Sequence, residues 1–237
     1  MAAHQVRALL MGGQACVFYG AAEFSRDTDL AVLADDDNWR RLLAALQALN
    51  AEVIAVPACR LDFLQRGHAI HFRCQHPEAD QMRVDIMAKM RGVDGFPKLW
   101  ERRTTLQDAD GTLYELLSLA DLVAAKKTQR NKDWPMIQRL VESDYLRQRE
   151  KPTGSQIEFW LRELRTPVLL IEAAQQHPAP GRALLGTRPL LKFAAASDPQ
   201  ALENALAEEE KVEREKDRSY WQPLKAELES LRHSKIQ

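Results

Sequence analysis

The fold of this chain is decided by Met11-Gly12-Gly13, by Asp27-Thr28-Asp29-Leu30 after the spacer 14–26, and by the later segment Val84-Asp85-Ile86. Side chains alternate along a β-strand, so Asp27 and Asp29 share one face of their strand. A second strand over 82–87 presents Asp85 on one face and apolar side chains on the other. Two neighbouring carboxylates repel unless a cation or a proton lies between them, and hard oxygen ligands favour Mg²⁺ or Mn²⁺. The three carboxylates therefore predict a divalent-metal site.

A simpler interpretation exists for each aspartate taken alone. Asp27 and Asp29 could cap a turn, and Asp85 could be a charge on an edge strand. The joint pattern favours the metal site, because a Gly-Gly turn, an Asp pair and a third Asp on a later strand occur together.

This combination resembles the signature of the nucleotidyltransferase superfamily, which has the polymerase-beta-like fold. That signature is a hydrophobic residue and Gly-Gly or Gly-Ser, a spacer, and then Asp, a hydrophobic residue and Asp or Glu. The segment 13–27 is most similar to the bacterial stand-alone or toxin-type branch. Thr28 stands in the hydrophobic position, and Glu23 stands where that branch commonly has a basic residue.

The resemblance implies a metal-dependent enzyme that moves a nucleoside monophosphate from an NTP to a hydroxyl or phosphate acceptor and releases pyrophosphate. Asp27 and Asp29 would hold the metal bound to the triphosphate, while Asp85 would hold a second metal or act as the general base. Gly12 and Gly13 would bind phosphate through their backbone, because a residue without a Cβ allows close approach. Ser25 could bond the γ-phosphate region.

A second segment, 119–133, is similar to the helix that follows the sheet in these enzymes. Ser118 and Asp121 form a capping box, which predicts that a helix starts there. The resemblance implies that Lys126 reaches the nucleotide phosphates. The alternative is a solvated basic helix end, favoured by the helix dipole.

We expect an α+β protein, with a small mixed-sheet nucleotidyltransferase domain at residues 1–110 and a mainly helical region at 111–237 that completes the cleft. A helix from Asp36 or Asp37 to Asn50 and a strand over 52–56 fit the first part. Beyond Gly111 the strand patterns fade. The charge-dense stretch 201–219 predicts a long solvated helix, with a bend at Trp221 and Pro223 before the last helix.

Composition sets limits on partners and location. The 237 residues carry a net charge of −1, so any basic surface for RNA must be local, around 126–132 and at Arg102 and Arg103. The three cysteines lack metal-type or redox-type spacing, which suggests reduced thiols in the cytoplasm. The apolar stretch 8–18 is interrupted by glycines and is too short to span a bilayer, so no membrane association is expected.

His68, His71, Cys74 and His76 resemble zinc ligands at first sight. As a strand, however, this segment would direct His68 and His71 to opposite faces and would separate His68 from Cys74 by roughly 20 Å. We therefore interpret it as the strand that pairs with 82–87 through the turn at 76–80.

Two rival functions remain. One is a toxin-like enzyme that modifies tRNA or a protein and has an antitoxin partner. The other is a catalytically silent nucleotide-binding or interaction module that has kept the fold.

Overall fold

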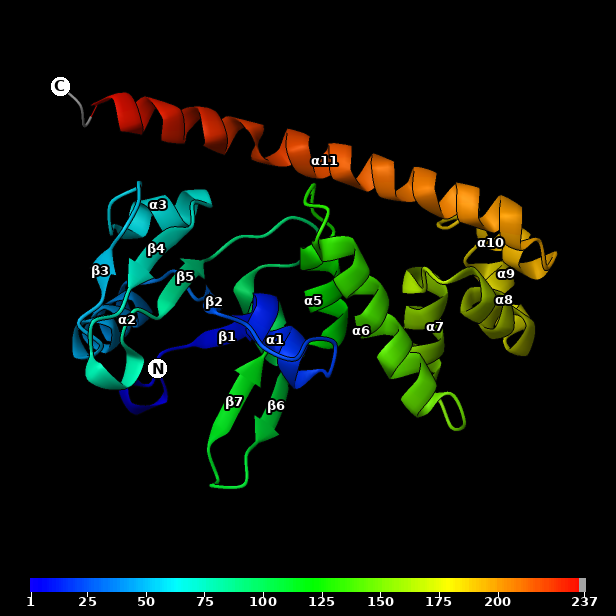
Figure 1. Cartoon of the computed structure of the whole chain (residues 1–237), viewed down its shortest axis with the longest axis horizontal. Helices are drawn as coiled ribbons and strands as arrows, with labels where there is room; N and C mark the ends of the chain where they lie inside the picture. The colour runs from blue at the N-terminus through cyan, green and yellow to red at the C-terminus, as the bar shows by residue number, and fades with distance from the viewer. Residues whose placement is uncertain (235–237) are drawn as a thin grey trace. The chain divides into compact units, whose positions relative to one another are not determined.

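The computed structural model describes residues 1–234, whose helices and strands are drawn in Figure 1. The chain forms two compact units. Of the residues described, the first comprises 1–125 and 219–234, and the second comprises Lys126–Arg218. The fold is α+β with a mixed sheet and a mainly helical C-terminal region, as the sequence predicted. Among the described residues, no helix is long and apolar enough to cross a membrane.

A seven-stranded sheet organises the first unit, in the order β3-β4-β5-β2-β1-β7-β6. Its centre is the parallel pair β2 and β5, flanked by antiparallel β1 and β4. The strands are β1 (Ala8–Met11), β2 (Asp27–Val32), β3 (Glu52–Val53), β4 (Ile70–Arg73), β5 (Arg83–Met87), β6 (Thr104–Gln107) and β7 (Leu113–Leu116).

One face of the central strands is apolar and buried. Leu30, Val84 and Ile86 pack there with Leu42 and Leu46 of the helix α2 (Asp36–Ala48). Burying this face stabilises the sheet by roughly 25 cal/mol for each Å² of apolar surface removed from water. The alternation of β2 and β5 consequently turns their acidic side chains to the opposite face.

The remaining helices of the first unit are short. They are η1 (Ala2–His4), α1 (Gly12–Phe18), α3 (Leu61–Arg66), η2 (Pro77–Ala79), α4 (Phe96–Glu101) and α5 (Leu119–Lys126), whose last residue belongs to the second unit. The second unit contains α6 (Asp133–Gln148), α7 (Gly154–Glu163), α8 (Pro167–Gln176), α9 (Pro178–Ala183), α10 (Leu191–Ala195) and α11 (Pro199–Ser234) up to Arg218.

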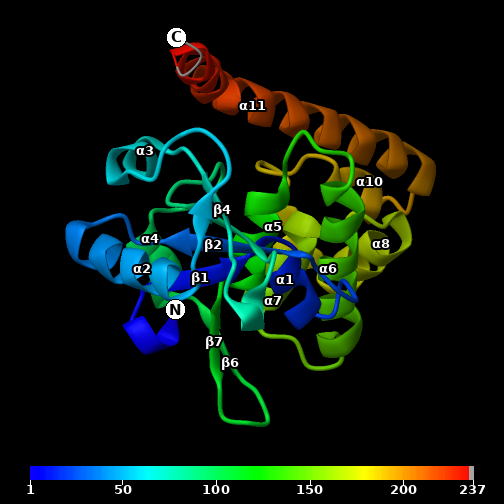
Figure 2. The ribbon, with the colours of Figure 1, turned by 60° about the vertical axis from the view of Figure 1, so that its left-hand side comes forward.

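The strands β6 and β7 were not predicted. They form an antiparallel hairpin in which Gln107 pairs with Leu113, and Figure 2 shows its tip projecting beyond the rest of the sheet. Gly111, with φ +87°, lies in its turn. The domain boundary expected after residue 110 therefore falls inside this hairpin, and the compact sheet unit continues to Ala125.

Two smaller predictions were wrong. Asp35, rather than Asp36 or Asp37, caps α2, because its side chain accepts the backbone N–H of Asn38. The separate last helix expected after Trp221 and Pro223 is not observed, since α11 runs from Pro199 to Ser234 with Pro223 inside it. Proline lacks the backbone N–H, so this 36-residue helix has one backbone donor fewer at Pro223.

Candidate active site

Gly12 lies directly beneath the carboxylate of Asp29. It is the first residue of α1 and has φ +62°, a conformation that glycine adopts without strain. A Cβ at this position would be 1.8 Å from Asp29 Oδ2. The predicted glycine turn and the predicted carboxylate are therefore in van der Waals contact.

Gly13 has the same relation to Ser25. A Cβ at Gly13 would lie 2.4 Å from Ser25 Oγ. The Ser25 hydroxyl donates to the Asp27 carbonyl over 3.0 Å, and the Gln14 amide donates to the Ser25 carbonyl over 3.0 Å. These contacts hold the loop before β2 against the start of α1, so Ser25 lies beside the glycine pair.

The strand register brings the three aspartates to one face. Asp29 of β2 is the direct partner of Asp85 on β5, and Asp27 is the partner of Arg83. Residues paired across adjacent strands project from the same face of a sheet. Asp27, Asp29 and Asp85, which we call the acidic row, therefore line one surface.

Two basic side chains accompany the acidic row. Arg83 Nε donates to Asp85 Oδ1 over 2.9 Å, and His71 Nδ1, from β4, lies 2.9 Å from the same oxygen. Burial alone would raise the pKa of Asp85, but the bonds from His71 and Arg83 outweigh it and lower the pKa below its usual value. Asp85 is therefore ionised at neutral pH.

Arg83 also interacts electrostatically with the rest of the acidic row. Its pKa is raised, first by the hydrogen bond to Asp85, and the charges of Asp27 and Asp29 add to the effect. The guanidinium group thus supplies positive charge to a surface on which three carboxylates would otherwise repel one another.

The donors of this face have the chemistry that a hard divalent cation requires. Asp29 and Asp85 carry carboxylate oxygens on adjacent strands, and because Gly12 has no Cβ the Asp29 carboxylate can lie against the start of α1. Within residues 1–234, however, no three His, Cys, Asp or Glu side chains converge as a ready-made metal site. The residues fit a Mg²⁺ or Mn²⁺ ion by ligand type.

Lys126 lies in the second unit and is 8% exposed. Its Nζ is 3.3 Å from Asp133 Oδ1, and Thr128 and Arg130 bond the other oxygen of Asp133. Burial would raise the pKa of Asp133, but the charge of Lys126 and these contacts lower it. Lys126 is therefore an ion-paired side chain in this structure, and its role toward a nucleotide stays a prediction.

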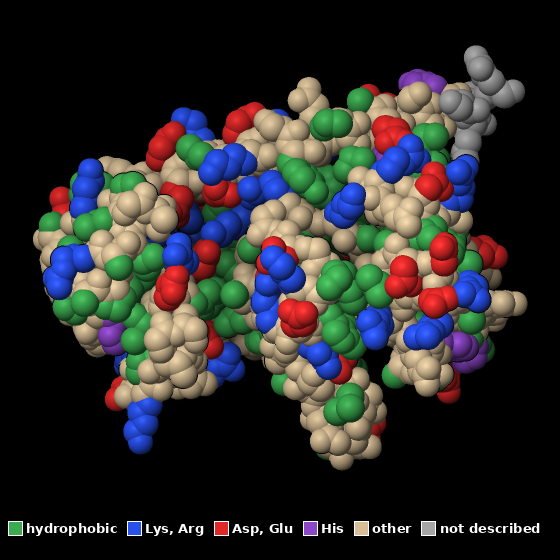
Figure 3. Space-filling view, turned by 180° about the vertical axis from the view of Figure 1, so that it is seen from behind, with side chains coloured by type: hydrophobic (Ala, Val, Ile, Leu, Met, Phe, Trp, Pro, Cys, Tyr) green, Lys and Arg blue, Asp and Glu red, His purple; other side chains and the backbone are tan. Residues whose placement is uncertain are grey.

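Three other basic residues suggested for a local RNA surface are also paired, namely Arg102, Arg103 and Lys127. Arg102 binds Asp121 through two bonds of 2.6 Å, and Arg103 binds Glu115 over 2.6 Å. Lys127 lies 2.7 Å from a carboxylate oxygen of Glu163. Lys, Arg, Asp and Glu side chains are interspersed on the face drawn in Figure 3.

The sequence analysis did not predict that His71 and Arg83 would contact Asp85. His71 was considered only as a possible zinc ligand, although pairing 70–73 with 83–87 places it opposite Asp85. His68 precedes β4, is buried, and binds Glu227 through Nε2 over 2.8 Å. The predicted pairing of these two strands is confirmed, and the alternation of β4 could have identified His71.

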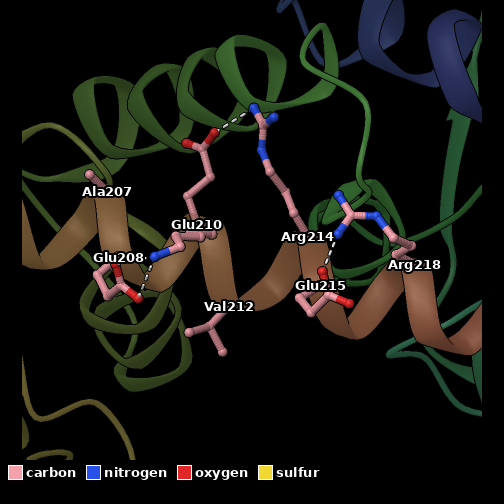
Figure 4. A pocket seen from close by; sticks show the side chains of 8 residues that line it. Ala207, Glu208, Glu210, Val212, Arg214, Glu215 and Arg218 are labelled. Carbon is pink, nitrogen blue, oxygen red and sulfur yellow. Dashed lines mark hydrogen bonds and ion pairs between the residues drawn. The ribbon is translucent and has the colours of Figure 1, made fainter.

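The charged surface of α11 forms a separate hollow of about 710 Å³ in the second unit (Figure 4). Lys211 pairs with Glu208 at 3.4 Å, and Arg214 pairs with Glu210 at 2.6 Å. Pairs three or four residues apart are neighbours on one helix. This surface is the solvated helix predicted from the charge-dense sequence.

The chain was compared with known proteins on the basis of its sequence. It matches no protein-family model and no curated protein sequence.

Proposed function

We propose that this protein is a metal-dependent nucleotidyltransferase of the cytoplasm that transfers a nucleoside monophosphate from an NTP to an acceptor. The contact of Gly12 with Asp29 is the observation that carries the proposal. This contact brings together the Gly-Gly pair and the Asp pair of the sequence signature, because the backbone of a residue without a Cβ lies against an aspartate carboxylate.

In the proposed reaction, an acceptor oxygen forms a bond to the α-phosphorus of the NTP. The bond between the α-phosphorus and its bridging oxygen to the β-phosphate breaks, and pyrophosphate leaves with the electron pair. The acceptor hydroxyl loses its proton to a base. Bound Mg²⁺ or Mn²⁺ would neutralise charge on the triphosphate and polarise its phosphoryl oxygens.

The residues have distinct proposed roles. Asp27 and Asp29 would hold the metal, and the backbone at Gly12 and Gly13 would bind phosphate beside Ser25. The lowered pKa of Asp85 makes it a weak proton acceptor, so a role as ligand or anchoring anion suits it better than that of general base. Lys126 would need to exchange Asp133 for a phosphate to take part in nucleotide binding.

The test uses radiolabelled NTPs incubated with the protein and a cell extract, with and without Mg²⁺. Transfer of label should require the metal and should disappear in Asp29→Asn, which keeps the shape of the side chain. The Asp62→Asn variant, altered in an exposed ion pair with Arg66, should be as active as wild type. Undiminished transfer by Asp29→Asn would overturn the proposed catalytic role of the acidic row.

A second candidate is a silent nucleotide-binding module, and Arg83 favours it. A guanidinium already offsets the charge of the acidic row, so a nucleotide could bind without a metal. A thermal shift assay separates the two. A ligand whose concentration is one hundred times its Kd raises the free energy of unfolding by about 2.7 kcal/mol. The enzyme should need NTP and Mg²⁺ together, whereas the module should show the full shift with NTP in EDTA.

A further inference from the structure

Two arginines lie directly opposite each other at the end of the acidic row. Arg73, the last residue of β4, is the register partner of Arg83, the first residue of β5. Like charges directly opposite each other on neighbouring strands destabilise a sheet. Asp85 already offsets the charge of Arg83, so the charge of this pair that lacks a counter-ion in the described part of the chain is that of Arg73.

The two guanidinium groups differ in how they are neutralised. Arg83 is bonded to Asp85, and its Nη2 lies 3.2 Å from His71 Nδ1. Arg73 is exposed and has neither an ion pair nor a side-chain hydrogen bond among residues 1–234. Its partner on the other side, Glu52 of β3, is in register with it but forms no ion pair with it.

The sheet order separates the two ends of this surface. Gly12 and Asp29 belong to α1 and β2, where the proposed function places the triphosphate. Moving from β2 to β5 and then to β4 leads to Arg83 and then Arg73. Neighbouring strands are about 4.8 Å apart, so Arg73 lies two strands from the metal-binding aspartates.

We infer that Arg73 and Arg83 form a phosphate-binding subsite for the acceptor, which is therefore a phosphate-bearing molecule. Arginine presents several donors in a planar fork that matches phosphate oxygens. A phosphate dianion would relieve the repulsion between the two guanidinium groups, while Arg83 keeps its bond to Asp85. That the bound molecule is the acceptor rests on the proposed function, because phosphate binding by itself does not require nucleotidyl transfer.

The experiment measures binding of phosphate-bearing probes by NMR titration in EDTA without NTP. The probes are inorganic phosphate, ribose 5-phosphate, and a short oligoribonucleotide with and without a 5′-phosphate. Arg73→Gln should weaken binding of the phosphate-bearing probes at least fivefold, and Arg73→Lys should weaken it less because it keeps the charge. Arg40→Gln, altered in an exposed ion pair on α2, should bind like wild type.

The pattern among probes identifies the source of the phosphate. If the oligoribonucleotide binds more tightly only when it carries the 5′-phosphate, the acceptor is a polynucleotide end. If ribose 5-phosphate binds as tightly as the phosphorylated oligoribonucleotide, the acceptor is a small metabolite. Equal affinities of Arg73→Gln and wild type for every probe would overturn the subsite. In a parallel titration with NTP and Mg²⁺, loss of binding by the same factor in Arg73→Gln would assign Arg73 to the donor nucleotide and also overturn the subsite. Phosphate binding that depends on Arg73 in a protein indifferent to NTP would instead refute the proposed function.

Discussion

At the scale of single residues, Gly12 satisfies two requirements that no other residue meets. Its φ of +62° is unfavourable for side chains with a Cβ, and the space where a Cβ would lie is taken by Asp29 Oδ2. Backbone conformation and carboxylate position are therefore coupled at this point.

Replacing Gly12 with alanine should destabilise the protein by at least about 1–2 kcal/mol, the cost of left-handed backbone for a residue with a Cβ. The added methyl group should also displace Asp29 and reduce any Mg²⁺-dependent transfer. Urea unfolding measures the first effect. Gly154→Ala is the matched control, since nothing lies within 4 Å of its Cβ position in the first turn of α7. Equal stability of both variants would contradict the close approach at Gly12.

At the scale of secondary-structure elements, Asp133 joins the end of α5 to the start of α6. It is 2% exposed and accepts bonds from Lys126, Thr128 and Arg130. Removing one partner of a buried ion pair leaves the other charge unpaired, which costs about 3–5 kcal/mol. This junction therefore depends on a polar network rather than on apolar packing alone.

Asp133→Ala should lower the free energy of unfolding by about 3 kcal/mol at neutral pH. The exposed pair of Asp62 with Arg66 provides the comparison, and Asp62→Ala should cost less than about 1 kcal/mol. Urea unfolding of both variants measures the difference. A similar small cost for both would mean that the buried network contributes little.

The same carboxyl should make stability depend on pH. Because the folded-state pKa of Asp133 is lowered, its contribution is complete above the pKa of the unfolded chain and is lost as the pH falls through the folded-state pKa. The stability difference between wild type and Asp133→Asn should therefore be largest near neutral pH and shrink in acid. A difference that is constant from about pH 7 to about pH 3 would contradict the lowered pKa.

At the scale of the whole molecule, the first unit is built from both ends of the chain. Glu227, near the end of α11, binds His68 over 2.8 Å and also pairs with Arg66. Leu224 Cδ1 would lie 3.5 Å from a Cβ at Gly67. The sheet unit thus obtains part of its packing from residues that follow the second unit in sequence.

We expect Glu227→Ala to reduce stability by about 1–3 kcal/mol, because buried His68 would lose the partner of its Nε2. Glu229→Ala, an exposed change two residues away, should have little effect. Thermal and urea unfolding provide the measurement. Should both variants unfold like wild type, the C-terminal segment would not stabilise the sheet unit.

The sequence alone determined the central elements of the sheet unit. The patterns over 27–30 and 82–87 predicted the strands observed as β2 and β5, and a turn was predicted at the Gly-Gly pair, where α1 begins. One half of the capping box predicted from Ser118 and Asp121 is present, because the Ser118 hydroxyl oxygen accepts the backbone N–H of Asp121 over 3.2 Å, and the Ser118 hydroxyl also donates to the Asp121 carboxylate over 2.6 Å. Each of these features is formed by residues close together in the chain, so it can be predicted from a short stretch of sequence.

Tertiary structure decided the rest. Strand register placed His71 and Arg83 around Asp85, and it set Arg73 opposite Arg83. The hairpin of β6 and β7 was missed because its short strands are half exposed and carry a weak alternating pattern. Pairing between distant strands depends on the whole sheet rather than on the sequence of one strand. In the same way, the partner of a buried charge depends on tertiary packing, so Lys126 could be placed on a helix from sequence but could not be assigned to Asp133.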